Sequence, residues 1–142
     1  LVLTQALGEY EDRFRELQLE PVNRLNAENA LIMADGKLLW RVFDNLLSNI
    51  CKYSLPGTRV YLNTELRDGR VTVSFKNISR YALDISSDEL MERFVRGDSS
   101  RSTEGSGLGL SIARSLTTMQ GGTFDISIDG DLFRADVSFP VI

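Results

Sequence analysis

A glycine-rich run that leads directly into an apolar helical pattern constrains this chain more than any other feature. Glycine occupies positions 105, 107 and 109, and an apolar stripe at helical spacing follows, made of Leu108, Ile112, Leu116 and Met119. Glycines allow a backbone to approach an anion closely, and the N-terminus of a helix favours negative charge. A flexible loop before any helix would give the same letters. The absence of a following Lys-Ser/Thr pair excludes the common P-loop.

A second helix, about sixty positions earlier, carries two carboxamides on one side. It is predicted from the cap residue Asp35 to about Tyr53, and Asn45 and Asn49 lie four residues apart with Lys52 close to the same line. An amide oxygen is a hard, neutral ligand suited to Mg²⁺, and a lysine supplies a point charge for a phosphate. Together with the glycine run, this stripe suggests a nucleoside triphosphate held through a divalent metal. A solvated helix flank is the competing interpretation.

The remaining patterns indicate an α+β domain. A first helix is predicted by an apolar stripe made of Leu3, Leu7, Tyr10, Phe14 and Leu17. We expect this stripe to pack in the core, and a contact between subunits is the less favoured alternative. Residues 31–33 read as a short buried strand, and two hairpins turn at 67–69 and 129–131. We expect a single domain, 1–142, folded as a two-layer α/β sandwich with about three helices on one face of a mostly antiparallel sheet.

Composition bounds the class of protein. A net charge of −4 without a basic cluster argues against binding to nucleic acid. One cysteine, Cys51, excludes an internal disulfide, and its apolar helical surroundings predict a buried free thiol in a reducing compartment. No apolar stretch approaches the roughly 20 residues that span a bilayer. Because the chain opens on Leu1, we expect a fragment of a longer protein.

Three motifs in order resemble those of the catalytic, ATP-binding domain of bacterial sensor histidine kinases, in the wider GHKL superfamily. Residues 44–53 (DNLLSNICKY) resemble its N box, residues 94–98 (FVRGD) its F box, and residues 105–113 (GSGLGLSIA) its second glycine box. The resemblance covers essentially the whole chain and implies the Bergerat-type ATP-binding fold. Residues 96–107 would then be the ATP lid.

The resemblance also implies roles for individual residues. Asn49 would ligate Mg²⁺, while Asn45 and Lys52 would hold phosphates, and Tyr53 would lie near the nucleoside. Arg96 would reach the γ-phosphate, which makes Asn45 and Arg96 the catalytic candidates. The phosphates would be capped by the glycine box, namely Gly105, Gly107, Leu108 and Gly109.

One motif departs from the family pattern. The family's first glycine box has an Asp that accepts a hydrogen bond from the adenine amino group, followed by two glycines. Here Asn77 falls at the Asp position, and Ser79 and Tyr81 replace the glycines. An Asn carbonyl still accepts from an amine, but it forfeits a charge-assisted bond worth about 1 kcal/mol more than a neutral one. Asn77 merely ending a strand is the alternative.

A second substitution bears on the reaction. The ATP-hydrolysing relatives carry a Glu general base at the position of Asn45, and an amide cannot take a proton at neutral pH. ATP would therefore be kept for transfer to a histidine, and this chain contains no histidine. The resemblance places that histidine on a separate dimerisation domain of the same protein, with a response regulator further downstream. It also implies a homodimeric, membrane-anchored parent whose catalytic domain is on the cytoplasmic side.

Two other functions stay open at this stage. Loss of the first glycine box would be compatible with a degenerate module that binds little nucleotide and acts through protein contacts. An anti-sigma-type serine kinase shares the same fold and would transfer the phosphoryl group to a serine.

Overall fold

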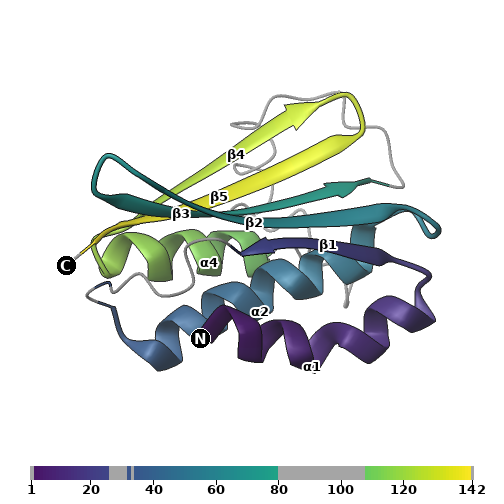
Figure 1. Ribbon diagram of the computed structural model, residues 1–142, viewed down its shortest axis with the longest axis horizontal. Helices are drawn as coiled ribbons and strands as arrows, with labels where there is room; N and C mark the ends of the chain where they lie inside the picture. Colours follow the sequence, from purple (N-terminus) through teal and green to yellow (C-terminus); the bar gives the residue numbers. More distant parts are fainter. Residues whose placement is uncertain (1, 26–31, 33, 80–107, 142) are drawn as a thin grey trace.

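The computed structural model describes residues 2–25, 32, 34–79 and 108–141, which form one sheet with helices on a single face (Figure 1). The elements are α1 (Val2–Glu16), β1 (Glu20–Leu25), α2 (Gly36–Tyr53), β2 (Arg59–Arg67), β3 (Arg70–Ile78), α4 (Leu108–Met119), β4 (Thr123–Asp129) and β5 (Leu132–Pro140). The strand order is β1-β2-β3-β5-β4, with only the β1–β2 pair parallel among these strands. The predicted α+β sandwich is confirmed.

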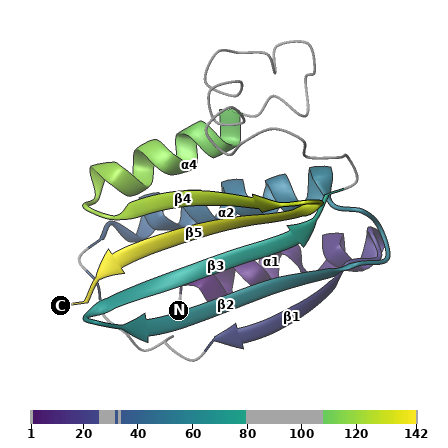
Figure 2. The ribbon, with the colours of Figure 1, turned by 90° about the horizontal axis from the view of Figure 1, so that it is seen from above.

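The central helix, α2, begins and ends as the sequence predicts. The Asp35 carboxylate caps it by accepting hydrogen bonds from the backbone N–H groups of Lys37 and Leu38, at 2.8 and 3.2 Å. Ser54 leaves the helical conformation and ends it. Seven side chains on one face are buried: Leu39, Val42, Phe43, Leu46, Leu47, Ile50 and Cys51. The helix therefore forms the middle of the core, between α1 and α4 (Figure 2).

The strand β3 supplies the opposite wall of the core. Val71 and Phe75 are buried, and the Phe75 ring lies 5.8 Å from the Phe43 ring of α2, centroid to centroid. Because side chains alternate across a strand, Asn77 continues the same row, with Phe133 of β5 as its cross-strand partner. A polar amide thus ends an otherwise apolar row.

The buried face of α4 differs from the predicted stripe. Leu110, Ala113 and Thr117 are buried, whereas Leu116 is only half-buried and Met119 is 74% exposed. The Thr117 hydroxyl donates a 2.7 Å hydrogen bond to the Ala113 carbonyl, which satisfies its polar atom inside the core. The predicted stripe was therefore wrong for this face: the apolar residues Leu110 and Ala113 lie outside that stripe and are buried, and Thr117 joins them because its hydroxyl is satisfied within the helix.

The strand β1 is absent from the sequence-based expectation. Its side chains are exposed or half-buried, so no alternating apolar pattern marks it. Pro21 is tolerated because β1 is an edge strand, paired only with β2. Of the predicted strand 31–33, only Ile32 is described, as an isolated bridge to Val141, and Leu31 and Met33 lie outside the described residues.

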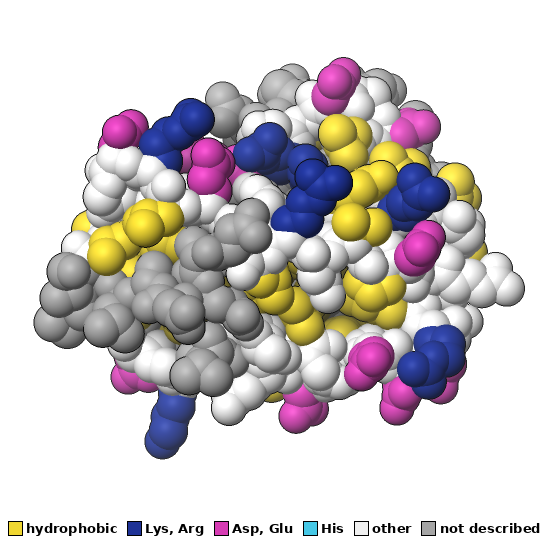
Figure 3. Space-filling view, in the orientation of Figure 1, with side chains coloured by type: hydrophobic (Ala, Val, Ile, Leu, Met, Phe, Trp, Pro, Cys, Tyr) yellow, Lys and Arg dark blue, Asp and Glu magenta, His cyan; other side chains and the backbone are white. Residues whose placement is uncertain are grey.

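The surface is mixed in charge. On the face seen in Figure 3, Lys and Arg side chains lie among Asp and Glu side chains. Within the described residues, the exposed large hydrophobic side chains are Leu55 between α2 and β2, Leu66 in β2 and Met119 in α4. None of the helices described is both long and apolar enough to cross a membrane.

Candidate functional site

Three element ends meet at one end of the molecule. The C-terminal half of α2, the end of β3 and the start of α4 all lie there (Figures 1 and 2). The helix dipole places the partly positive end of α4 at this location. The predicted site residues that the structure describes come from these same three elements, so the fold brings together stretches that are far apart in the sequence.

Backbone hydrogen bonds fasten the end of α2 to the end of β3. Ser54 forms an isolated bridge with Ser79, and the N–H of Leu55 donates to the carbonyl of Ile78 at 2.8 Å. The N–H of Ser79 donates in turn to the carbonyl of Asp131, in the β4–β5 turn, at 2.8 Å. The position of α2 relative to β3 is therefore fixed at the point where the candidate residues lie.

The polar stripe of α2 is partly enclosed. Asn45 and Asn49 are half-buried and Lys52 is exposed. Asp44 contacts α1 through Tyr10, and at about 100° per residue Asn45 and Asn49 point roughly 100–140° round the helix from it, away from α1. Since α4 packs on the other side of α2, the two amides lie on the flank nearer to α4.

Two amide atoms of this region are buried without a hydrogen-bond partner in the described part of the chain. They are Nδ2 of Asn45, a donor, and Oδ1 of Asn77, an acceptor. The other end of the Asn77 amide, Nδ2, donates to Oγ of Ser54 at 2.8 Å. A buried unsatisfied polar atom costs about 1–3 kcal/mol, so native proteins retain few of them. One unmet donor and one unmet acceptor fit a polar ligand.

The other predicted residues are placed unevenly. Tyr53, the last residue of α2, is half-buried. Leu108 and Gly109 form the first turn of α4. Three predicted residues, Arg96, Gly105 and Gly107, lie outside the described residues. The predicted lid at 96–107 and part of the glycine box lie outside them as well.

A preformed carboxylate site for a metal is lacking in the described ranges. No three His, Cys, Asp or Glu side chains gather there in a way that could hold an ion. A divalent metal at this end would therefore rely on amide oxygens such as that of Asn49, and on oxygens brought by its ligand.

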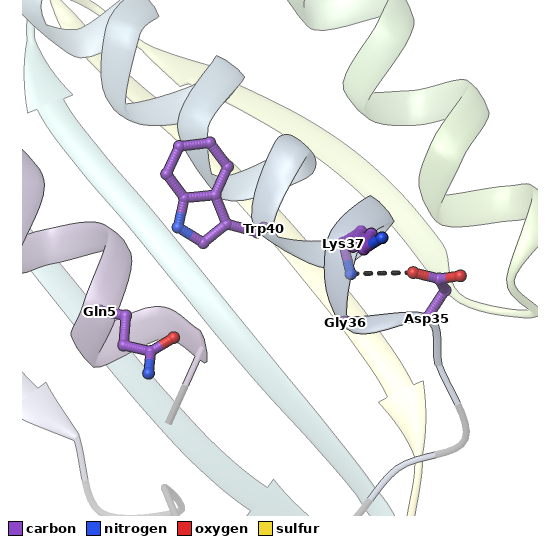
Figure 4. Close-up of a pocket in the computed structure, with 5 residues that line it drawn as sticks. All are labelled: Gln5, Asp35, Gly36, Lys37 and Trp40. Carbon is purple, nitrogen blue, oxygen red and sulfur yellow. Dashed lines mark hydrogen bonds between the residues drawn. The ribbon is translucent and has the colours of Figure 1, made fainter.

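A separate hollow of about 660 Å³ lies at the other end of α2 (Figure 4). It is lined by Gln5, Asp35, Gly36, Lys37 and Trp40, so it contains none of the predicted site residues. Gln5 reaches it from α1 and Trp40 from α2. The hollow is wide open to solvent and is not the site predicted from the sequence.

Comparison with known families decides the identity of the fold. Residues 34–141 match the family described as histidine kinase-, DNA gyrase B- and HSP90-like ATPases. The chain belongs to this ATPase family. The match spans well over half of the chain and includes α2, β3 and α4, the three elements that meet at the candidate site.

Individual relatives of this ATPase domain are bacterial sensor proteins. It is 36% identical over 131 residues to "Probable sensor protein PcoS" of Escherichia coli, covering 90% of this chain and 28% of that protein. It is 36% identical over 103 residues to sensor histidine kinase HprS of Escherichia coli K12, covering 67% of this chain and 21% of that protein. The chain thus spans about a quarter of the length of these relatives.

Solved structures share the fold. The catalytic domain of histidine kinase ThkA superposes with a TM-score of 0.82 at 21% identity, covering 98% of this chain and 90% of that one. Full-length ShkA, solved in complex with AMPPNP, gives a TM-score of 0.77 at 25% identity and covers 99% of this chain and 29% of that one. The arrangement of helices and sheet is therefore that of histidine kinase catalytic domains.

Sequence reasoning missed two contacts of the ATPase domain. The Ser54 hydroxyl pairs with Asn77, and the Tyr10 hydroxyl of α1 pairs with Asp44. Both pairs join residues more than twenty positions apart, and no spacing rule relates them. Ser54 follows Tyr53 directly, and its position after a helix suggested no role beyond ending it.

Proposed function

We propose that this chain binds Mg·ATP where α2, β3 and α4 meet, and that it donates the γ-phosphoryl group to a histidine on a separate dimerisation domain in two-component signalling. The carrying observation is the pair of unsatisfied buried amide atoms, Nδ2 of Asn45 and Oδ1 of Asn77. One needs an acceptor, such as a phosphate oxygen, and the other needs a donor, such as the amino group of a base.

The residues of α2 would bind the metal, the phosphates and the nucleoside. Asn49 would provide an amide oxygen to Mg²⁺, which keeps its other positions for phosphate oxygens and water. Asn45 and Lys52 would hold phosphates, with one amide N–H and one ammonium group. Tyr53, at the end of the helix, would lie against the nucleoside.

In this proposal the chain positions the phosphates and neutralises their charge, and it does not activate water. When bound, Mg·ATP supplies the transferable phosphoryl group, and the metal offsets phosphate charge. The partly positive start of α4, with Leu108 and Gly109, would face the phosphates. Arg96, Gly105 and Gly107 complete the proposal by resemblance, with residues 96–107 as the lid. Asn45 offers no proton acceptor at neutral pH, so hydrolysis would be slow.

The acceptor must come from outside this chain, since it has no histidine. The sensor histidine kinases among its relatives support a histidine-bearing dimerisation domain as the direct partner, with a response regulator acting later. In the parent we propose a membrane-anchored homodimer that carries this domain on the cytoplasmic side.

Titration calorimetry with Mg·ADP and Mg·ATP tests the binding step. We expect Asn45→Ala and Asn49→Ala each to weaken binding by at least tenfold, and Asn49→Ala also to reduce the dependence on Mg²⁺. Asn23→Ala, at an exposed position on β1, is the matched control and should bind as the native chain does. Absence of binding at millimolar nucleotide would support a degenerate binding module instead.

The transfer step needs a second experiment. The chain is mixed with a purified dimerisation domain that carries the acceptor histidine, and labelled Mg·ATP is added. Label that is lost in acid supports histidine phosphorylation. Acid-stable label on a serine would support an anti-sigma-type serine kinase and contradict the proposal.

A further inference from the structure

We propose that the Ser54–Asn77 pair relaxes the choice of purine, so that the site accepts a 6-oxo purine nucleotide as well as a 6-amino one. This inference rests on the proposed nucleotide site and concerns only which base it takes. It follows from the chemistry of one buried amide and the hydroxyl that holds it.

The amide of Asn77 is enclosed and bonded at one end. Asn77 is 1% exposed and Ser54 is 2% exposed. Nδ2 of Asn77 donates to Oγ of Ser54 at 2.8 Å, which leaves Oδ1 without a partner among the residues described. In this orientation the amide offers an acceptor, which suits the amino group of a 6-amino purine.

The opposite orientation is also satisfied. An amide keeps its shape when its oxygen and nitrogen exchange places, and a hydroxyl both donates and accepts. After such an exchange, Oδ1 of Asn77 would accept from the Ser54 hydroxyl, and Nδ2 would be the free end. The site would then offer a donor, which suits the carbonyl oxygen of a 6-oxo purine.

The backbone fixes Ser54 for both orientations. Its N–H donates to the carbonyl of Ile50 at 3.0 Å, and its bridge to Ser79 joins it to the end of β3. The N–H of Leu55 is bonded to Ile78 as well. The hydroxyl therefore stays within reach of Asn77 without a backbone movement.

A carboxylate at position 77 would behave differently. Both of its oxygens accept, so turning the side chain never presents a donor. A 6-oxo purine would then set oxygen against oxygen and leave buried acceptors unmet, at about 1–3 kcal/mol each. The amide can therefore donate to the base or accept from it, whereas the carboxylate can only accept.

The test compares affinities for Mg·ATP and Mg·ITP, which differ in the group at position 6 of the base. We expect the native chain to bind the two within tenfold of each other. Asn77→Asp should raise the ATP preference by at least a further tenfold. ATP binding without ITP binding in the native chain overturns this inference alone, whereas binding of neither nucleotide overturns the proposed function too.

Ser54→Ala tests whether the Asn77 amide uses both orientations or only one. Unlike Asn77→Asp, it introduces no buried charge. Removing the hydroxyl takes away the partner of both orientations, so both affinities should fall while their ratio stays within threefold of the native value. A ratio that changes by more than threefold would indicate a one-way contact and contradict the inference. Ser127→Ala, at an exposed position on β4 and on the face of the sheet opposite to Asn77, removes a hydroxyl that is not part of the pair and should leave both affinities unchanged.

Discussion

The Tyr10 hydroxyl of α1 donates a 2.5 Å hydrogen bond to the carboxylate of Asp44, the residue directly before Asn45 in α2. The same hydroxyl lies 3.2 Å from the Asp44 carbonyl oxygen. Burial and the bond to Asp44 both raise the pKa of Tyr10 above its ordinary value of 10.0, so the phenol keeps its proton at neutral pH. The first helix is thus linked to the helix that carries the candidate site.

Replacing Tyr10 by Phe should destabilise the fold by about 1.5–3 kcal/mol, the usual range for a hydrogen bond to a charged group. The ring would keep its contact with Phe14, whose centroid is 6.2 Å away, so packing changes little. Urea unfolding measures the difference. Arg15→Gln is the control on the same helix, because its ion pair with Asp12 is exposed and should contribute less than about 1 kcal/mol. Equal effects of the two substitutions would contradict this account.

Two glycines offer a paired test of packing. A Cβ on Gly122 would lie 2.7 Å from the Phe139 ring and 2.8 Å from the Ser138 carbonyl oxygen, and backbone cannot easily move away. Gly122→Ala should therefore destabilise the fold by about 1–3 kcal/mol. Gly8, within α1, has nothing within 4 Å of such a Cβ, and Gly8→Ala should stabilise by up to about 1 kcal/mol. Thermal unfolding that shifts in the same direction for both would refute this.

The single cysteine gives a test that depends on pH. Burial raises the pKa of the Cys51 thiol from 9.0 to about 11, although Arg13 opposes the shift. A raised folded-state pKa contributes stability that is complete below pH 9 and is lost as pH rises towards 11. At pH 8, a thiol reagent such as DTNB should react at least tenfold more slowly with the native chain than with the chain in guanidinium. Fast, complete reaction of the native chain would show that the thiol is accessible.

The sequence predicted most elements because they follow regular periods. The buried residues of α2 recur at the helical period, and those of the β2–β3 and β4–β5 hairpins mostly alternate as strand residues do. Turns at Asp68 and Gly130 mark the two hairpins. The strand β1 lacked such a pattern, because an exposed edge strand buries too little to leave one. The buried face of α4 was predicted wrongly, since Leu110 and Ala113 are buried in place of Met119 and Thr117 satisfies its hydroxyl within the helix.

The sequence predicted which residues belong to the candidate site, but it did not predict the contacts between them. Spacing placed Asn45 and Asn49 on one flank of α2, and both are half-buried there. The bond between Asn77 and Ser54 depends on how the end of β3 meets the end of α2, which is a tertiary relationship. Periodicity describes one element at a time and carries no information about such a meeting.

The choice of Asn at position 45 yields a final prediction about hydrolysis. An amide cannot accept a proton from water at neutral pH, whereas a carboxylate can, and general-base catalysis typically contributes about 10²–10⁴-fold. If Asn45 faces the phosphates as proposed, Asn45→Glu should raise phosphate release from Mg·ATP at least tenfold above the native rate. Asn45→Gln is the matched control, since it has the same length as glutamate but no base.

The comparison of the two variants isolates the base from the change in size. Both side chains extend one methylene beyond Asn45, so any loss of ATP affinity from crowding should be similar in the two. Phosphate release is therefore measured at saturating Mg·ATP for each variant. Faster release by Asn45→Glu alone would place position 45 next to the attacked phosphate. Equal release by the two variants would mean that Asn45 lies away from the reacting group, and its unmet Nδ2 would need another ligand.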